Sequence, residues 1–194
     1  FPTKKEKPLV IDLATSSVAR GKIEIARREG KEIPKGWIID KNGKTSQNVD
    51  ELKDGGMLTS LGSLEELGSH KGYALGSLVD IMSGVLSGAN FGKWVPPFVS
   101  YLPLLPNLPG KGLGHFVGAM EVDGFRSVDE FKTSMDIWIN SFKSADRVDE
   151  NQSVYVPGEK EFDIEEKRKK TGIPLNIKVL EDLEKLEKKF SIKL

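Results

Sequence analysis

The stretch Gly68-Ser69-His70-Lys71-Gly72-Tyr73-Ala74-Leu75 places a His-Lys pair on a glycine-flanked turn just before a long apolar segment. The apolar segment, residues 73–91, predicts a helix. Glycine recurs at every fourth position, at 68, 72 and 76 and again at 84, 88 and 92, so these glycines share one side. We expect something to pack very close to that side. The turn itself suits a charged ligand, because a lysine at a helix N-terminus adds its charge to the backbone N–H donors there.

The length of this apolar helix raises the question of a membrane span. Asp80 and a high content of Gly, Ser and Asn make it unfavourable in lipid, so we expect a buried helix. Residues 1–8 have no initial Met and no basic-then-apolar signal design, and they resemble the middle of a longer chain.

Charge and cysteine content narrow the classes of function. A chain of 194 residues can bury a core of its own. Lys and Arg total 29 and so do Asp and Glu, so we expect a small ligand or a protein partner and no nucleic acid. The absence of Cys excludes disulfides, thiolate nucleophiles and Cys-ligated metals, and it favours a cytoplasmic location.

The N-terminal residues predict a strand followed by a helix. Residues 8–14 are apolar, with β-branched Val10 and Ile11, which is typical of a strand buried on both faces. Thr15 and the serines after it can cap the helix, which should end at Gly30. The chain therefore begins with a strand, a turn and a helix.

The middle of the chain alternates short predicted elements with loops. Residues 37–39 predict a short strand that runs into a turn at residues 40–43, and we expect the glycine-rich stretch 54–68 to be a functional loop. Residues 93–112 are too rich in proline for regular structure and predict an ordered apolar loop or an interface arm. The aromatic residues of this arm are Trp94, Phe98 and Tyr101.

Residues 112–118, GLGHFVG, invite comparison with the glycine fingerprint of dinucleotide-binding proteins. The spacing is one residue too long, and the segment runs into a predicted strand at residues 112–122 instead of out of one. We therefore reject the fingerprint and expect a glycine-lined strand that packs closely on a helix. His115 is then expected to be a core or subunit-contact residue and not a catalyst.

The C-terminal third predicts three helices. Ser127 and Glu130 form a capping box that opens a helix. Residues 154–156 predict a short strand, residues 159–171 a charged helix and residues 179–190 an amphipathic one. The stripe expected to be buried on the first helix consists of Phe131, Met135, Trp138 and Phe142, and that on the last of Leu180, Leu183, Leu186 and Phe190.

Three stretches together resemble the malate/L-lactate dehydrogenase family of NAD(P)-dependent 2-hydroxyacid oxidoreductases: Asp12-Leu13-Ala14-Thr15, the turn around Lys71, and Asp149-Glu150-Asn151-Gln152 leading to Pro157-Gly158-Glu159. The likeness covers nearly all of the chain but only the later part of such an enzyme. It implies an α/β fold with a mixed β-sheet flanked by helices, a non-Rossmann cofactor-binding fold, and a C-terminal helical tail. We expect residues 1–157 to be part of a central cofactor-binding domain and residues 158–194 to be a C-terminal helical segment.

The resemblance also implies cofactor contacts. Asp12, Leu13, Ala14 and Thr15 would line the adenosine and pyrophosphate side, His70 and Lys71 would contact the cofactor, and Gly158 and Glu159 would reach towards the nicotinamide half. Each has a simpler alternative. Thr15 can be a helix cap, Lys71 can lie on an ordinary surface turn, and Glu159 can be a favourable first-turn acid.

The family's catalytic histidine and arginine come chiefly from a portion that precedes the matching part, so no catalytic residue is assigned here. Relatives act on malate, lactate, sulfolactate, ureidoglycolate, a diketo sugar acid or a cyclic imino acid, which leaves the substrate open. We expect NAD, with NADP possible, no metal, a homodimer and no membrane partner. The alternative hypothesis is a non-catalytic assembly or nucleotide-binding module derived from such an enzyme.

Overall fold

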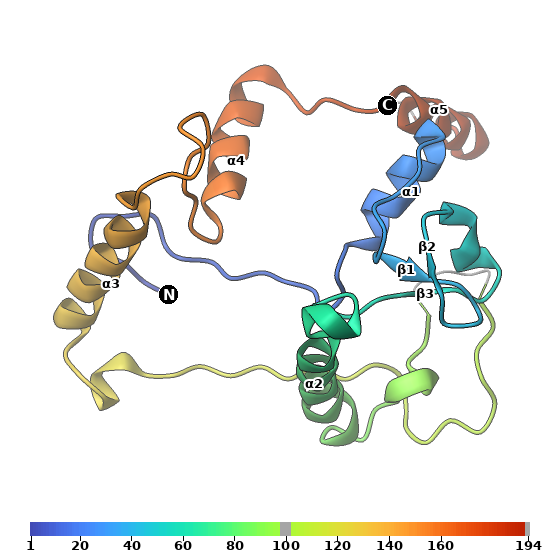
Figure 1. Cartoon of the computed structure of the whole chain (residues 1–194), viewed down its shortest axis with the longest axis horizontal. Coiled ribbons are helices and arrows are strands. Elements are labelled where there is room, and N and C mark those ends of the chain that lie inside the picture. The colour runs from blue at the N-terminus through green and yellow to red at the C-terminus, as the bar shows by residue number, and fades with distance from the viewer. Residues whose placement is uncertain (98–101, 193–194) are drawn as a thin grey trace. The chain divides into compact units, whose positions relative to one another are not determined.

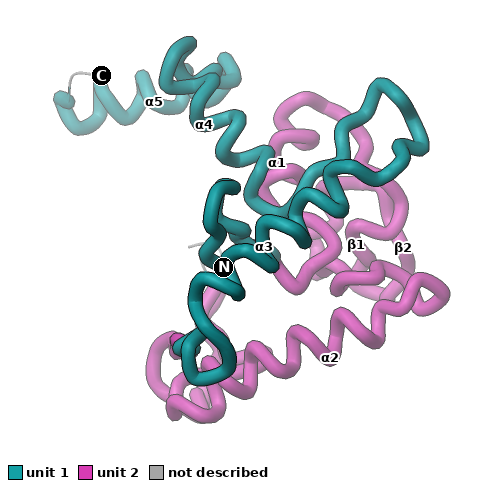
Figure 2. The backbone as a smooth tube through the Cα atoms, turned by 90° about the vertical axis from the view of Figure 1, so that its left-hand side faces the viewer, with its two compact units in different colours: residues 1–13, 120–194 teal, residues 14–119 magenta. Residues whose placement is uncertain are grey.

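The computed structural model describes residues 1–97 and 102–192 (Figure 1). Backbone contacts divide the chain into two compact units, shown in different colours in Figure 2. Unit 1 comprises Phe1–Leu13 and Met120–Leu194, and unit 2 comprises Ala14–Ala119. The expected boundary between residues 157 and 158 stays a prediction.

Unit 2 begins with helix α1, Arg20–Glu29. It ends, as predicted, at Gly30, whose φ of 67° lies in the left-handed region that glycine adopts without strain. The predicted cap is wrong, because the N-cap position belongs to Ala19 and no side chain caps the helix there.

The sheet of unit 2 has three short strands in the order β2-β1-β3. Ile38 of β1 pairs with Ser46 of β2 and Leu58 of β3, and both pairings are antiparallel. The prediction of a mixed sheet is therefore wrong for the described residues. A tight turn joins β1 to β2, and such a turn connects only antiparallel neighbours. The strands are β1, Ile38–Ile39, β2, Thr45–Ser46, and β3, Met57–Leu58.

The predicted turn at residues 40–43 is confirmed. Asp40 Oδ1 accepts the N–H groups of Asn42 at 2.8 Å and Lys44 at 2.9 Å. The hydrogen bonds from the Lys44 and Asn42 backbones lower the pKa of Asp40 below its usual value. Partial desolvation acts to raise this pKa, but the hydrogen bonds outweigh it. The Asp40 carboxylate therefore stabilises the turn between β1 and β2.

The core of unit 2 lies between α1, β1 and the segments next to them. Each of its aliphatic side chains is less than a tenth exposed, and burial of one such chain contributes about 1.5–3 kcal/mol. Short 3₁₀ segments at Val49–Lys53 and Glu65–Leu67 complete this region. The buried cluster is Val18, Ile23, Ile33 and Ile38, with Ala26, Trp37, Val49, Leu52 and Leu58 packed against it.

Helix α2 runs over Ser69–Asp80 and continues as a π-helical segment, Ile81–Val85. The predicted close packing on its glycine side is confirmed, because a Cβ at Gly84 would lie only 3.0 Å from Asn90 O. The prediction that the helix is buried is wrong for the described residues. Its apolar side chains are largely exposed, among them Tyr73, Leu78, Val79, Ile81, Val85 and Leu86.

Residues 110–114 pass close to the end of this helix without forming the predicted strand. Gly110 packs on the backbone of Ala89, and Gly114 packs on that of Ser83, with no room for a Cβ. The close glycine packing is thus confirmed, but the segment has no strand neighbour. His115 is exposed in the described structure and not part of a core. In the proline-rich arm, Phe98 and Tyr101 lie outside the described residues.

Unit 1 contains helices α3, Val128–Lys143, α4, Glu159–Thr171, and α5, Ile177–Phe190. The predicted N-cap is confirmed, because Ser127 Oγ accepts Glu130 N–H at 3.3 Å. The Glu130 carboxylate returns to the Ser127 hydroxyl, which donates to Oε2 at 2.7 Å, and not to the Ser127 backbone N–H of a full capping box. Of the expected buried stripe on α3, Trp138 and Phe142 are more than two-fifths exposed, and Ile139 is the buried residue instead.

Two further predicted strands are absent. Residues 8–14 and 154–156 carry no strand in the structure, and only Leu9 of the first segment is buried. Val10 N–H donates to Pro157 O at 3.4 Å, so the two segments touch without forming a ladder. Apolar, β-branched composition fits a strand, but a strand also needs a neighbour for its backbone groups.

Candidate functional site

In unit 2, the loop at residues 59–62 connects two of the predicted cofactor segments. Leu61 N–H donates to Thr15 O at 3.0 Å, which holds the segment around Ala14 and Thr15. Ser60 Oγ donates to Ser69 O at 3.0 Å, which holds the first turn of α2. The structure therefore ties Ala14 and Thr15, on one side, and His70 and Lys71, on the other, to one loop.

Glycines make this close arrangement possible. Gly72 of α2 packs on the backbone of Leu61, and no Cβ would fit there. A Cβ at Gly62 would lie 2.7 Å from backbone atoms of Gly68. A Cβ at Gly76 would lie 3.5 Å from Thr15 Oγ1. The sequence motif Lys-Gly thus has a structural reason: its glycine lets the loop reach the helix that carries the lysine.

The side chains of His70 and Lys71 are exposed. The N–H donors next to them are not free, because Lys71 N–H donates to Gly68 O at 2.9 Å and Ser69 N–H to Leu64 O at 3.1 Å. The prediction that backbone N–H donors are free at this turn is therefore wrong for Ser69 and Lys71. The Lys71 ammonium group is the positive charge that this turn offers to an anion.

In unit 1, Asp12, Leu13 and Gly158 line a groove of about 710 Å³. Gly158 has a φ of 88°, and a Cβ at this position would lie 3.0 Å from the Val10 Cβ. The volume falls in the usual range of small-molecule sites, about 300–1,000 Å³. The remaining lining residues are mostly apolar or aromatic with a few charges: Val10, Ile11, Tyr155, Val156, Pro157, Lys160, Glu161, Phe162 and Glu165.

One cation and one ring stand out in this groove. Lys160 Nζ lies 4.7 Å from the centroid of the Tyr155 ring. The pair presents a flat aromatic surface next to a positive charge, and both features suit a nucleotide.

Glu159 is engaged by its own unit. Lys143 Nζ of α3 donates to Glu159 Oε1 at 2.5 Å, and Val156 N–H donates to Oε2 at 3.2 Å. Partial burial acts to raise the pKa of Glu159, but the hydrogen bonds from Lys143 and Val156 and the charges of Lys143 and Lys7 outweigh it and lower the pKa below its usual value. The hydrogen bond to Glu159 raises the pKa of Lys143. The pair is therefore ionised over a wide pH range.

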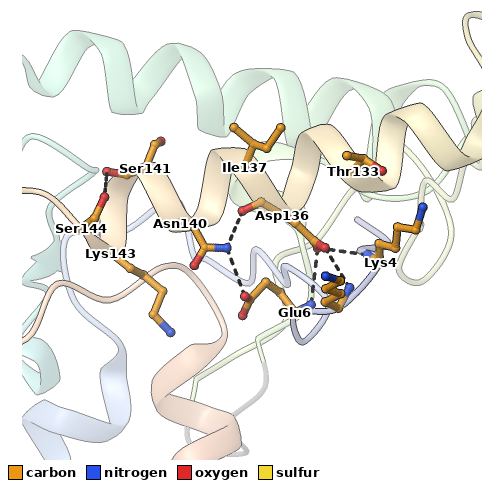
Figure 3. Close-up of a pocket in the computed structure, with 10 residues that line it drawn as sticks. Lys4, Glu6, Thr133, Asp136, Ile137, Asn140, Ser141, Lys143 and Ser144 are labelled. Carbon is orange, nitrogen blue, oxygen red and sulfur yellow. Dashed lines mark hydrogen bonds between the residues drawn. The ribbon is translucent and has the colours of Figure 1, made fainter.

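A wider hollow of about 860 Å³ lies where residues 4–6 run along α3 (Figure 3). Asp136 points to this segment and accepts N–H groups from Lys4 at 3.0 Å, Lys5 at 2.9 Å and Glu6 at 3.4 Å. Partial desolvation acts to raise the pKa of Asp136, but these hydrogen bonds lower it overall. Asn140 Nδ2 donates to Glu6 Oε1 at 3.1 Å. These polar groups bind one another, so the hollow looks like a packing contact and not a ligand site.

The described residues provide neither a metal-binding cluster nor a membrane-spanning helix. Within residues 1–97 and 102–192, no group of three or more His, Cys, Asp or Glu side chains could hold a metal ion. No helix in the same part of the chain is long and apolar enough to span a membrane.

Comparison with known proteins identifies the family. The family model described as malate/L-lactate dehydrogenase matches residues 1–184. Malate dehydrogenase from Pyrococcus horikoshii is 39% identical over 192 residues, which are 98% of this chain and 51% of that protein. Malate/(S)-sulfolactate dehydrogenase from Methanothermus fervidus is 31% identical over 186 residues, 96% of this chain and 50% of that protein.

Solved structures of dehydrogenases share the fold of this chain. The crystal structure of malate dehydrogenase from Entamoeba histolytica superposes with a TM-score of 0.80 at 32% identity and covers all of this chain and 54% of its own. Sulfolactate dehydrogenase from Methanocaldococcus jannaschii gives a TM-score of 0.69 at 24% identity, which supports the fold alone. The chain therefore belongs to the malate/L-lactate dehydrogenase family, and it spans about half the length of the curated relatives that it matches.

Sequence reasoning missed several residues of these sites. Thr59 and Leu61 lie in the loop that was predicted to be functional, but no motif singles them out. Lys143 and Asp136 have partners 16 and about 130 residues away in the chain, and local patterns carry no signal for such contacts.

Proposed function

We propose that the chain forms the cofactor-binding part of an NAD(P)-dependent oxidoreductase that interconverts a 2-hydroxy acid and a 2-oxo acid. The observation that carries this proposal is family membership over residues 1–184, with relatives named as malate and sulfolactate dehydrogenases. Because the chain spans about half of those relatives, the complete activity belongs to the proposal.

The residues proposed to hold the cofactor lie in both units. In unit 2, the shared loop holds Ala14 and Thr15 near the start of α2, which carries His70 and Lys71. In unit 1, Asp12, Leu13 and Gly158 line the groove, and Glu159 lies directly beside it. A groove with apolar walls, an aromatic ring and a lysine suits a dinucleotide, which combines flat rings with phosphates.

In such an enzyme the bound nicotinamide supplies the hydride chemistry. The residues of this chain would contribute binding and orientation: Lys71 offers a positive charge to a phosphate, and the Glu159 carboxylate, fixed by Lys143, offers an oriented acceptor to a donor group. The catalytic acid and the cation that binds the substrate carboxylate stay unassigned. Among the described residues, neither His70 nor His115 has a hydrogen-bond partner that would mark it as a proton donor.

The finer features of the proposal follow from the family and the composition. We propose a malate- or lactate-like substrate, NAD in preference to NADP, and a homodimer. The lack of cysteine supports a reducing compartment such as the cytoplasm.

Calorimetric titration of the protein with NADH and NADPH tests the cofactor site. We expect saturable binding that Lys71→Ala weakens about tenfold, because a charge-assisted contact is lost. Lys35→Ala, which removes an exposed lysine of the same unit, is the matched control and should bind as the wild type does. If the folded protein binds neither nucleotide, the proposal is wrong.

A second candidate is a non-catalytic assembly module, and the exposed apolar side of α2 favours it. This candidate predicts association without nucleotide binding. The same titration therefore separates the two.

A further inference from the structure

Thr59 is a buried polar residue that no motif marked. Its side chain is 7% exposed, and its Oγ1 lies 2.6 Å from Gly36 O, 3.2 Å from Trp37 O and 2.6 Å from Ser17 Oγ. A threonine hydroxyl has one proton to donate, and a carbonyl oxygen can only accept. Thr59 therefore donates to the carbonyl of Gly36, and Ser17 donates its hydroxyl proton to Thr59.

This hydroxyl chain anchors the loop at residues 59–62 to the core. Gly36 and Trp37 directly precede β1, whose Ile38 is fully buried. On the other side, Thr59 O accepts Ser17 N–H at 2.9 Å, and Thr59 N–H donates to Trp37 O at 3.1 Å. The loop therefore begins at a point that several hydrogen bonds fix directly beside β1 and β3.

From that point the loop reaches both cofactor segments of unit 2. Leu61 N–H binds Thr15 O, and Ser60 Oγ binds Ser69 O in the first turn of α2. Ser63 Oγ also donates to Gly36 O, so the far end of the loop returns to the same carbonyl. A shift at Thr59 would therefore move the Thr15 segment and the Lys71 turn together.

We propose that Thr59 is a positioning residue for cofactor binding: its buried hydroxyl fixes the distance between the Thr15 segment and Lys71. This inference rests on the proposed function. Thr59 does not touch the cofactor, and its effect is transmitted through backbone hydrogen bonds of Ser17 and Leu61.

Thr59→Val tests the proposal, because valine keeps the shape of threonine and removes the hydroxyl. NADH binding is measured by calorimetry, and exchange of the Ser17 and Leu61 amide hydrogens is measured by NMR without nucleotide. We expect NADH binding to weaken about tenfold and exchange of both amides to accelerate at least about tenfold, consistent with the loss of one to two buried hydrogen bonds. Thr59→Ser, which retains the hydroxyl, should restore both.

A stability control separates positioning from general weakening. Ile33→Val removes one methylene group from the core, where Ile33 is 1% exposed, without touching the loop. It should leave NADH binding within about twofold of the wild type. Should Thr59→Val fail to fold, Ser17→Ala removes only the outer donor and should weaken binding about threefold.

The outcomes are distinguishable. Unchanged NADH binding by Thr59→Val, or an equal loss in Ile33→Val, would overturn the inference and leave the proposed function intact. If the wild type binds neither NADH nor NADPH, the proposed function is wrong and the positioning role falls with it, whatever the amide exchange shows.

Discussion

At the scale of single residues, the ion pair between Lys143 and Glu159 links two helices of unit 1. Lys143 ends α3, Glu159 begins α4, and the carboxylate also accepts Val156 N–H. The side chains are 38% and 19% exposed, so solvent screens the pair only in part. An acid in the first turn of α4 is also favourable towards the helix dipole. The Glu159 carboxylate thus stabilises the start of α4, and its bond to Lys143 fixes the orientation of this proposed cofactor contact.

Lys143→Met should lower the free energy of unfolding by about 0.5–1 kcal/mol at pH 7. The folded-state pKa of Glu159 is lowered, so its contribution is present above the unfolded pKa and is lost as the pH falls through the folded value. The pKa of Lys143 is raised, so its contribution is lost only as the pH rises through that raised value. Urea unfolding at pH 7 and pH 3 measures the difference between wild type and variant, which should shrink at pH 3.

Lys35→Met serves as the control, since Lys35 is exposed and lies in the other unit. A difference between wild type and Lys143→Met that is equally large at both pH values would show that the lysine acts through packing of its aliphatic chain and not through its charge.

At the scale of elements, glycine has opposite roles in α1 and α2. Gly72 of α2 is buried against the backbone of Leu61, and a Cβ there has no space. At Gly21 of α1, a Cβ would meet no other part of the described chain within 4 Å beyond its own stretch of helix. Both lie in helices, so helix propensity favours alanine at both, and only the tertiary contact differs.

Gly72→Ala should destabilise the protein by about 1–3 kcal/mol, because backbone atoms of the loop must move. It should also weaken NADH binding, since the same loop holds Thr15. Gly21→Ala should stabilise the protein by about 0.5–1 kcal/mol. Thermal unfolding of the two variants provides the comparison, and a stabilising effect of Gly72→Ala would contradict the close contact with Leu61.

At the scale of the whole molecule, the described residues leave a large apolar surface uncovered. On α2 and its π-helical continuation, Leu78 is 56% exposed and Leu86 65%. Soluble proteins rarely leave contiguous apolar patches of this kind open. The chain by itself is therefore expected to associate.

Leu78→Lys with Leu86→Lys should reduce concentration-dependent association, because each removes apolar surface and adds charge. Sedimentation velocity over a range of concentrations provides the measurement. Val148→Lys is the control, since Val148 is fully exposed and lies in the loop between α3 and α4. Equal association of the double variant and the wild type would show that another surface is responsible.

The sequence by itself determined what depends on neighbours along the chain. The end of α1 at Gly30, the N-cap at Ser127, the turn at Asp40 and the helix Glu159–Thr171 follow from residues within a few positions of one another. The Lys-Gly and Gly-acid motifs were also sufficient to indicate the family, because they are short and local.

The tertiary structure alone decided what depends on contacts between distant residues. Residues 8–14 have the composition of a strand, yet no ladder forms, since pairing needs a neighbour that composition does not specify. The apolar helix α2 was expected to be buried, but burial is a property of what surrounds a helix. The role proposed for Thr59 depends on folding, which brings its hydroxyl to Gly36 and Ser17, 23 and 42 residues away in the chain.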